Sequence, residues 1–205
     1  MTIRLHRGDL PDLSRYGGAS VAIDTETMGL DLRRDRLCVV QLSPGDGTAD
    51  VVQIAPGQTH APNLARLLGD SAVLKLFHFG RFDIGVLFQA FGVMPGPVYC
   101  TKIASRLART YTDRHGLKDL ARELLGVDLS KQQQSSDWGA SDLTEAQVAY
   151  AASDVLHLHA LKVKLDRMLE REGRAPLAAA CFGFLPERVR LDLGGWGSDD
   201  IFAHS

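Results

Sequence analysis

The sequence lacks several features that would point to particular classes of protein. It has no excess of positive charge: 23 Lys and Arg residues stand against 25 Asp and Glu residues, and the formal net charge is −2. Such a chain has no overall basic field that would attract long nucleic acids. It contains no apolar run near the roughly 18 residues of a membrane span, and no hydrophobic signal segment at its N-terminus. We therefore expect a cytoplasmic protein that makes no use of a membrane.

Cysteine is also scarce. The 205 residues include three cysteines, Cys38, Cys100 and Cys181, which are far apart and odd in number. This spacing matches neither a disulfide framework nor a metal-binding motif, so we expect reduced and mostly buried thiols. The 45% hydrophobic and 23% charged residues are ordinary for a globular protein. Because no repeat or low-complexity tract interrupts the chain, we expect one domain over residues 1–205.

The first chemical signal lies in residues 21–30. Three apolar residues predict a short buried strand, and Asp24-Thr25-Glu26 follow them ahead of a turn at Gly29. Residues two apart in a strand point to the same face, so Asp24 and Glu26 should project together. Adjacent anions repel each other, and an oxygen-bound divalent cation, Mg²⁺ or Mn²⁺, is their natural counter-charge. Taken alone, the pattern is also consistent with a solvated strand end.

The remaining sequence predicts a hairpin of strands followed by alternating helices and strands, which indicates an α/β protein. Besides the strand before Asp24, strands are expected at residues 3–5, 36–42, 49–54, 73–77 and 98–100. Helices are expected at residues 62–68, 81–91, 101–109, 116–125 and 144–172, with a helical turn from Pro11, a short helix after Gly173 and an ordered loop at 130–139.

Two further acidic positions accompany the first pair. Asp83 follows a predicted strand and lies in the first turn of the next helix, where the helix dipole alone would favour an acid. Tyr150 and Asp154 are four residues apart on a predicted helix and share a face. Either observation by itself fits an ordinary surface position. Their order along the chain, after Asp24 and Glu26, is far more specific than the separate parts.

These residues resemble the motifs of the DEDDy 3′→5′ exonucleases. Asp24 with Glu26, Asp83, and Tyr150 with Asp154 match the three motifs of that family. Within it, the chain resembles the ribonuclease D branch, and there the nanoRNase C group of single-domain oligoribonucleases. The matching segments are residues 24–30, 37–42, 110–118, 131–138 and 200–205. The resemblance implies a ribonuclease H-like α/β fold with a mixed central sheet flanked by helices, without the helical accessory domains of typical ribonuclease D proteins.

The resemblance also implies a mechanism that uses two divalent metal ions, Mg²⁺ or Mn²⁺, about 3.5–4 Å apart. Asp24 would bridge the two ions, and Glu26 and Asp154 would complete the first site. Asp83 would support the second ion through water. Tyr150 would orient the attacking water or take its proton.

Several other residues are candidates for contact with substrate. They are Thr27, Gly29, Leu30, His78, Phe82, Arg106, Arg109, Arg114, Gln133, Ser136 and Trp138. Leu30 could wedge against the terminal bases or belong to the core, and His78 could touch substrate or be structural. The arginines could form a phosphate clamp or a solvated basic face. Trp138 could line the cleft or lie in the core. Phe79 follows His78 where some relatives have Asn or a small residue, so base contacts there stay open.

The function expected from this set is hydrolysis of very short RNA, especially dinucleotides, to nucleoside monophosphates from the 3′ end. Short DNA stays open as a substrate. The alternative within enzymes is ribonuclease D-like trimming of longer or structured RNA 3′ ends. A binding module without catalysis is a third reading, and the presence of all four acids and the tyrosine speaks against it.

The tail over residues 191–205 is apolar but has little periodicity. Its apolar residues are Leu191, Leu193, Trp196, Ile201 and Phe202. Such a tail either packs back on its own domain or covers a neighbouring subunit. The resemblance favours a homo-oligomer, in the form of a ring-like octamer.

Overall fold

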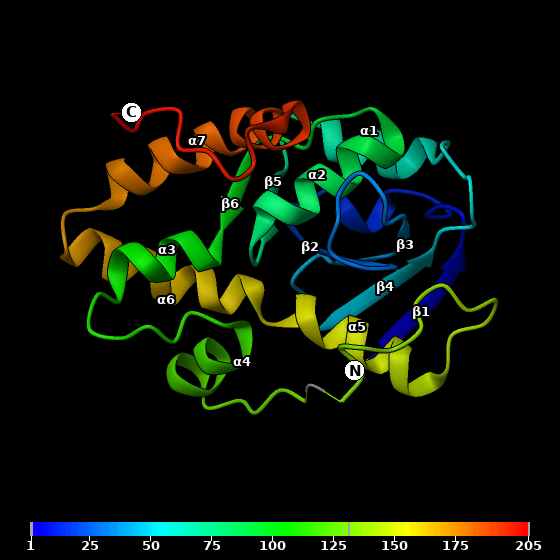
Figure 1. Cartoon of the computed structure of the whole chain (residues 1–205). Helices are drawn as coiled ribbons and strands as arrows, with labels where there is room; N and C mark the ends of the chain where they lie inside the picture. Colours follow the sequence, from blue (N-terminus) through cyan, green and yellow to red (C-terminus); the bar gives the residue numbers. More distant parts are fainter. Residues whose placement is uncertain (1, 131, 205) are drawn as a thin grey trace.

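A mixed six-stranded sheet is the frame of the computed structural model, which describes residues 2–130 and 132–204 (Figure 1). The strands are β1 (Thr2–Arg7), β2 (Ser20–Thr27), β3 (Leu37–Ser43), β4 (Thr48–Gln53), β5 (Leu74–Phe77) and β6 (Val98–Cys100). Their order is β1-β4-β3-β2-β5-β6. β3 runs antiparallel to its neighbours β2 and β4, and the other pairs are parallel. The expected strands and the mixed sheet are confirmed.

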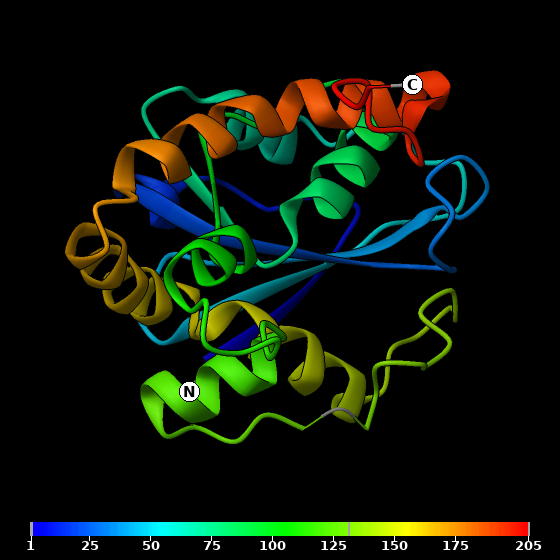
Figure 2. The same cartoon turned by 60° about the vertical axis from the view of Figure 1, so that its left-hand side comes forward.

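Helices cover both faces of the sheet (Figure 2). They are α1 (Pro62–Gly69), α2 (Gly80–Phe91), α3 (Thr101–Ala108), α4 (Leu117–Leu120), α5 (Glu145–Leu156), α6 (Leu158–Arg171) and α7 (Ala175–Leu191). Helix α5 packs against β1 to β4 on one face, while α2 packs on the other and is covered by α7. Among the helices of the described residues, none is both long enough and apolar enough to span a membrane.

The core lies where the central strands meet α2 and α5. Every residue of β3 is buried, as expected for a central strand with both faces covered. The apolar residues 21–23 of β2 are fully buried, as are Ile84 of α2 and Val155 of α5. This apolar packing holds β2 rigid up to the point where its sequence changes from apolar to acidic.

The end of β5 brings the second acidic motif to this point. β5 pairs with β2 only over Ser20–Ala22, so the acidic end of β2 extends past their pairing. Beyond β5 the chain turns sharply through Phe79, whose φ of 72° lies in the left-handed region that residues other than glycine rarely adopt. Gly80 follows because a Cβ there would come within 2.9 Å of the Cβ of Phe77. The turn starts α2 directly beside β2.

Two helix predictions were wrong in extent. The predicted helix over 144–172 is two helices, α5 and α6, because His157 at φ −105° and ψ −6° interrupts the helical path. No glycine or proline marks this break. The short helix predicted after Gly173 is instead the 17-residue α7. Gly183 and Pro186 lie within this helix, and its buried residues Ala178, Phe182, Leu185 and Val189 keep a helical spacing.

Smaller differences occur elsewhere. The helix predicted at 116–125 is α4 followed by a wider π-helical turn over Ala121–Leu125, and it ends at Gly126 as expected. The helical turn expected from Pro11 is a 3-10 turn over Ser14–Tyr16, which begins after Asp12 accepts a hydrogen bond from the Ser14 amide. The three cysteines are free, with Cys38 and Cys100 buried and Cys181 half-buried.

Candidate active site

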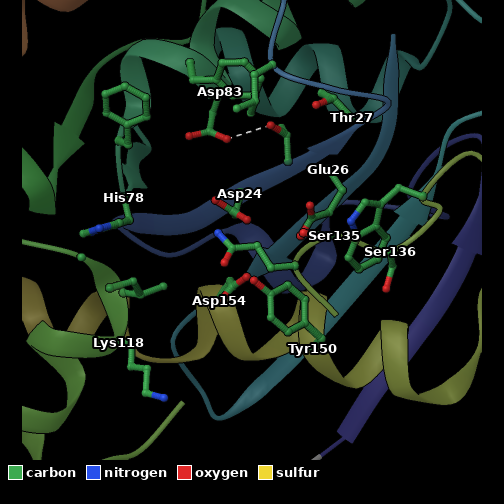
Figure 3. A pocket seen from close by; sticks show the side chains of 18 of the residues that line it. Asp24, Glu26, Thr27, His78, Asp83, Lys118, Ser135, Ser136, Tyr150 and Asp154 are labelled. Carbon is green, nitrogen blue, oxygen red and sulfur yellow. Dashed lines mark hydrogen bonds between the residues drawn. The ribbon is translucent and has the colours of Figure 1, made fainter. Parts of the chain in front are cut away.

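Four carboxyl groups gather at one end of the sheet, on the wall of a cavity of about 690 Å³ (Figure 3). Asp24 and Glu26 come from β2, Asp83 from the first turn of α2, and Asp154 from α5. One carboxylate oxygen from each of Asp24, Glu26 and Asp154 lies within 4.8 Å of the other two. We call Asp24, Glu26, Asp83 and Asp154 the acidic floor. The three predicted motifs therefore meet in space.

Hydrogen bonds from neighbouring strands orient the acidic floor. Gln41, the partner of Asp24 in the β2–β3 register, donates from Nε2 to Asp24 Oδ2 at 2.8 Å. The Thr25 hydroxyl donates to Asp83 Oδ1 at 2.7 Å, although Thr25 and Asp83 are far apart in sequence. Thr25 points to the opposite side of β2 from Asp24, so this one strand positions acids on both of its sides.

A capping box fixes the beginning of α5. The Gln147 amide donates to the Thr144 hydroxyl at 3.2 Å, and the Thr144 amide donates to Gln147 Oε1 at 2.9 Å. Tyr150 and Asp154 follow this cap by six and ten residues. They lie one turn apart on α5, and both point toward Asp24 and Glu26 (Figure 3). A local sequence signal thus sets the register of the third motif.

The electrostatics of the acidic floor favour a cation. Burial raises the pKa of Asp24, and the nearby Asp83, Asp154 and Glu26 raise it further. Burial, followed by repulsion from Asp154 and Asp83, raises the pKa of Glu26 to about 9. Burial raises the pKa of Asp154 to about 7 against the hydrogen bond with Tyr150, and that of Asp83 to about 7 against the hydrogen bond from Thr25. Ionised together, these carboxylates would repel one another in a site with little access to water.

The donor set fits hard divalent cations. Carboxylate oxygens on three elements converge, and no His or Cys belongs to the cluster of Asp24, Glu26 and Asp154. Oxygen ligands of this kind suit Mg²⁺ or Mn²⁺. The cation would also offset the repulsion that raises the pKa values of the cluster.

Tyr150 borders the same cluster. Its ring packs against Trp138 with ring centroids 6.0 Å apart, and its hydroxyl points toward Asp154 (Figure 3). Burial, and then the negative charges of Asp154 and Glu26, raise the pKa of Tyr150 above its ordinary value. The hydroxyl therefore stays protonated at neutral pH and is suited to donating a hydrogen bond.

The hydrophobic side chains of Leu30, Phe79 and Phe82 also line the cavity, and we call these three residues the apolar rim. Leu30 is 85% exposed, which excludes the core position that the sequence left open. Phe79 is 46% exposed, and the Lys102 ammonium lies 4.4 Å from the centre of its ring. Exposed apolar side chains beside a polar cavity are suited to stacking on bases.

Most of the predicted substrate contacts do line the cavity. They are Thr27, Gly29, Leu30, His78, Phe82, Ser136 and Trp138. Trp138 is only 3% exposed, so it belongs to the core and to the cavity wall at once. The His78 Nδ1 lies 2.9 Å from the Thr101 hydroxyl, and burial, with the charge of Lys102, lowers the pKa of His78 to about 3. His78 is therefore a neutral residue that braces the wall.

Four predicted contacts do not line the cavity: Arg106, Arg109, Arg114 and Gln133. Arg109 is fully buried, where its guanidinium pairs with Glu123 and donates to the Arg114 carbonyl at 2.7 Å. The expectation that Arg109 and Arg106 share an open helical face was wrong, because α3 ends at Ala108 and the chain turns Arg109 inward. The predicted segment 131–138 includes Lys131, which lies outside the described residues.

Among the described residues the cavity contains two cations, Lys102, which was not predicted, and Lys118, which the sequence placed with the arginines in the alternative of a phosphate clamp. Lys102 from the first turn of α3 and Lys118 from α4 both line it. Lys102 lies two residues after the end of β6, and the carboxyl ends of adjacent parallel strands share one edge of a sheet. That placement was a usable signal for Lys102.

Comparison with known proteins agrees with this geometry. A family model described as 3′-5′ exonuclease matches residues 11–170. The chain belongs to this exonuclease family. Ribonuclease D of Gluconacetobacter diazotrophicus is 38% identical over 167 residues, which cover 82% of this chain and 42% of that protein. The chain thus spans about two fifths of the length of this curated relative.

Solved structures of the family include chains of the same extent. NrnC (nanoRNase C) of Brucella melitensis is 65% identical with a TM-score of 0.98, and the match covers 100% of both chains. The expected resemblance to nanoRNase C is confirmed. Other structures of that protein contain bound Mg²⁺ or are bound to pGG. Escherichia coli RNase D is 26% identical with a TM-score of 0.80, over 93% of this chain and 51% of that one.

Proposed function

We propose that this chain is a divalent-metal-dependent 3′→5′ exoribonuclease that hydrolyses very short RNA, especially dinucleotides, to nucleoside monophosphates. The observation that carries the proposal is the acidic floor, with Asp24, Glu26 and Asp154 within reach of one cation and Asp83 beside them. The Mg²⁺ and the pGG bound to Brucella NrnC, which is 64–65% identical, support both the cofactor and the size of the substrate.

Asp24, Glu26 and Asp154 would hold one Mg²⁺ or Mn²⁺, and Asp83 with Asp24 a second. When bound, two such ions supply an activated water and stabilise the charge that develops on the leaving 3′ oxygen. Tyr150 orients the attacking water by donating a hydrogen bond, because its raised pKa keeps the hydroxyl protonated. Gln41 and Thr25 keep Asp24 and Asp83 in position during the reaction.

The rest of the cavity supports a short substrate. Leu30 and Phe79 offer stacking surfaces that read no base edge, which suits an enzyme without sequence preference. Lys102 and Lys118 are the cations placed to bind phosphate oxygens, in the role first expected of Arg106 and Arg114. A long strand would need a continuous basic groove, and the net charge of −2 does not favour one.

Trimming of longer RNA 3′ ends, as by a ribonuclease D, is the second candidate. The curated relatives named ribonuclease D favour it, but the matched region covers only 42% of the first of them. Short DNA remains a candidate substrate. The proposal takes residues 1–205 as one cytoplasmic exonuclease domain.

Self-association is part of the proposal. Among the tail residues, Trp196 is 50%, Ile201 47% and Phe202 77% exposed. Apolar side chains gathered at one end of a chain are suited to covering a second copy, and the likeness to nanoRNase C favours a ring-like homo-octamer. Light scattering at micromolar concentration should give a mass several times the 22.3 kDa of the chain. A monomer would remove this part of the proposal.

Hydrolysis of a 5′-labelled RNA dinucleotide tests the proposed activity. The purified protein should release labelled mononucleotide in Mg²⁺, lose this activity in EDTA, and recover it when Mg²⁺ or Mn²⁺ is added back. Asp154→Asn, which keeps the size of the side chain, is the matched inactive control. Binding of the dinucleotide without hydrolysis in any of the metals would favour the non-catalytic reading instead.

A further inference from the structure

The beginning of the C-terminal tail is bound to the first turn of α2. The Asp192 carboxylate accepts two hydrogen bonds from Arg81, from Nε at 2.6 Å and from Nη2 at 2.7 Å. Arg188 adds a third contact at 2.9 Å. The Asp192 side chain is only 8% exposed. A bidentate ion pair of this kind, largely shielded from water, is geometrically specific. It holds Arg81, which lies in the sequence between Phe79 and Phe82 of the apolar rim.

The next tail residue is bound to the opposite part of the same rim. The Leu193 carbonyl accepts a hydrogen bond from Arg33 Nη2 at 3.1 Å, and Arg33 belongs to the loop that carries Leu30. The tail then reverses at Gly195, whose φ of 109° disfavours other residues. Its returning carbonyl at Gly197 accepts from Arg81 Nη2 at 2.9 Å. In Figure 1 this segment, in red, turns back beside the end of α7.

A second hollow of about 760 Å³ lies between these attachments. Its lining includes Leu30, Phe79 and Phe82, the apolar rim that it shares with the catalytic cavity, together with Arg33, Arg81 and Asp192. Through Arg81 and Arg33, two consecutive tail residues, Asp192 and Leu193, thus bind the segment of Phe79 and Phe82 and the loop of Leu30.

The acidic floor has anchors that do not involve the tail. Asp83 accepts a hydrogen bond from the Thr25 hydroxyl of β2, and Asp24 accepts one from the Gln41 side-chain amide of β3. Phe79 lies two residues after β5, in the turn that precedes Arg81, and its ring is 46% exposed. The tail can therefore act on the rim without moving the carboxylates.

We infer that Asp192, through Arg81, is a positioning residue for substrate binding, and that residues 192–193 set the spacing of the apolar rim. This inference rests on the proposed hydrolysis of short RNA and deepens it. Asp192 does not touch the reacting atoms. It holds Phe79 and Phe82 where a base can stack on them, while Leu193 holds the loop of Leu30 through Arg33.

Steady-state kinetics on an RNA dinucleotide test the inference, with wild type, Asp192→Asn, Arg81→Lys and the double variant. Stacking of a base on these side chains contributes to binding, so its partial loss should raise KM about tenfold. We expect kcat to stay within about twofold and the Mg²⁺ concentration for half-maximal rate to stay unchanged. The double variant should be no worse than the more impaired single variant, because both remove one connection. Glu187→Gln, which removes an exposed ion pair with Arg190 on the same helix, is the matched control.

The outcomes separate the inference from the proposed function. A wild type that does not hydrolyse the dinucleotide contradicts the proposed function itself. An active wild type with an unchanged KM in folded Asp192→Asn overturns the inference, as does a fall in kcat with a higher Mg²⁺ requirement, which would place the effect on the acids. If Asp192→Asn does not fold, Arg33→Met tests the other attachment, and an unchanged KM there overturns the inference as well.

Discussion

The acidic floor and the apolar rim of one cavity are built in opposite ways. The floor lies on β2, α2 and α5, where Asp24, Glu26 and Asp154 are half-buried and Asp83 is only 4% exposed. The rim lies on loops and on the first turn of a helix, where Leu30 is 85% exposed and Phe79 adopts a left-handed conformation. Hydrogen bonds within the sheet orient the floor, whereas contacts with the distant C-terminal tail hold the rim.

This difference indicates that the floor serves metal binding and catalysis, and that the rim serves substrate binding. Catalysis by metal ions requires ligands fixed to fractions of an ångström, which rigid strands and helices provide. Selection of a substrate by length requires walls around its ends, and loops can supply these without disturbing the ligands. Changes to the floor should therefore affect kcat, and changes to the rim should affect KM.

Loss of a floor carboxylate should have the largest effect. Asp24→Ala, Glu26→Ala, Asp83→Ala and Asp154→Ala should each lower kcat about a thousandfold or more, because metal ions contribute several kcal/mol of charge stabilisation. Each variant should stay folded by circular dichroism, since removal of a buried acid relieves repulsion. Asp142→Ala, an exposed acid paired with Arg7, is the control. Near-normal turnover in two of the four variants would refute the two-metal assignment.

Tyr150→Phe should have the next largest effect, about a hundredfold in kcat, the usual scale for one group that positions a proton or a water. Only the hydroxyl is removed, so the packing against Trp138 and the binding of Mn²⁺ should persist. Calorimetric titration with Mn²⁺ and the pH profile of kcat measure the two parts. A rate equal to that of wild type at every pH would exclude Tyr150 from orienting the water.

Changes to the cavity lysines should have smaller effects, and mainly on KM. Lys102→Met and Lys118→Met should each raise KM for a dinucleotide about tenfold, the scale of one charge-assisted hydrogen bond, and should weaken its dependence on salt. Arg106→Met and Arg114→Met, outside the cavity, are matched controls and should stay within about twofold of wild type. A raised KM in the arginine variants with an unchanged KM in the lysine variants would favour the phosphate clamp of arginines and contradict the geometry of the cavity.

The smallest effect should be a shift in thermal stability with pH. Asp83 and Asp154 have pKa values raised to about 7 and Glu26 to about 9. Unfolded carboxyls titrate near pH 4 and unfolded histidines near pH 6.5. Because burial lowers the pKa of His78 to about 3, His78 opposes the carboxyls below about pH 6.5. From about pH 6.5 to 8 the raised carboxyls make the folded metal-free protein bind more protons than the unfolded chain. Its stability should therefore fall as pH rises through this window.

Divalent cations bind the ionised carboxylates, so their stabilising effect should grow over the same range. Differential scanning fluorimetry of EDTA-treated protein between about pH 6.5 and 8, with and without Mn²⁺, measures both trends. Asp83→Asn should weaken the dependence on pH. A Tm of the metal-free protein that rises with pH would contradict the electrostatics described for the floor.

The two regions also differed in how far the sequence could predict them. The floor acids follow from local rules: Asp24 and Glu26 alternate on a strand, and Tyr150 and Asp154 lie one helical turn apart after a capping box. The rim depends on long-range contacts with no local signature. The exposure of Leu30 was therefore left open, and the attachment of Arg81 to Asp192, 111 residues away, was not foreseen.

Arg109 is a second residue whose environment could not be predicted from local sequence. Its spacing from Arg106 indicated a shared helical face, yet one residue decides the outcome, because α3 ends at Ala108. Beyond that end the guanidinium turns inward to Glu123 and to the Arg114 carbonyl. Helix ends are difficult to place from sequence within one or two residues, and here that margin separates a surface cation from a buried one.

The most direct test of the account is the dependence of the rate on substrate length. RNAs of two, three, five and seven nucleotides, labelled at the 5′ end, should be digested side by side at one salt concentration, and kcat/KM determined for each. We expect the highest value for the dinucleotide and a steep fall with each added nucleotide, because a net charge of −2 does not favour the continuous basic groove that a longer strand needs. Equal values for all four would contradict it and favour a general ribonuclease D-like trimming enzyme.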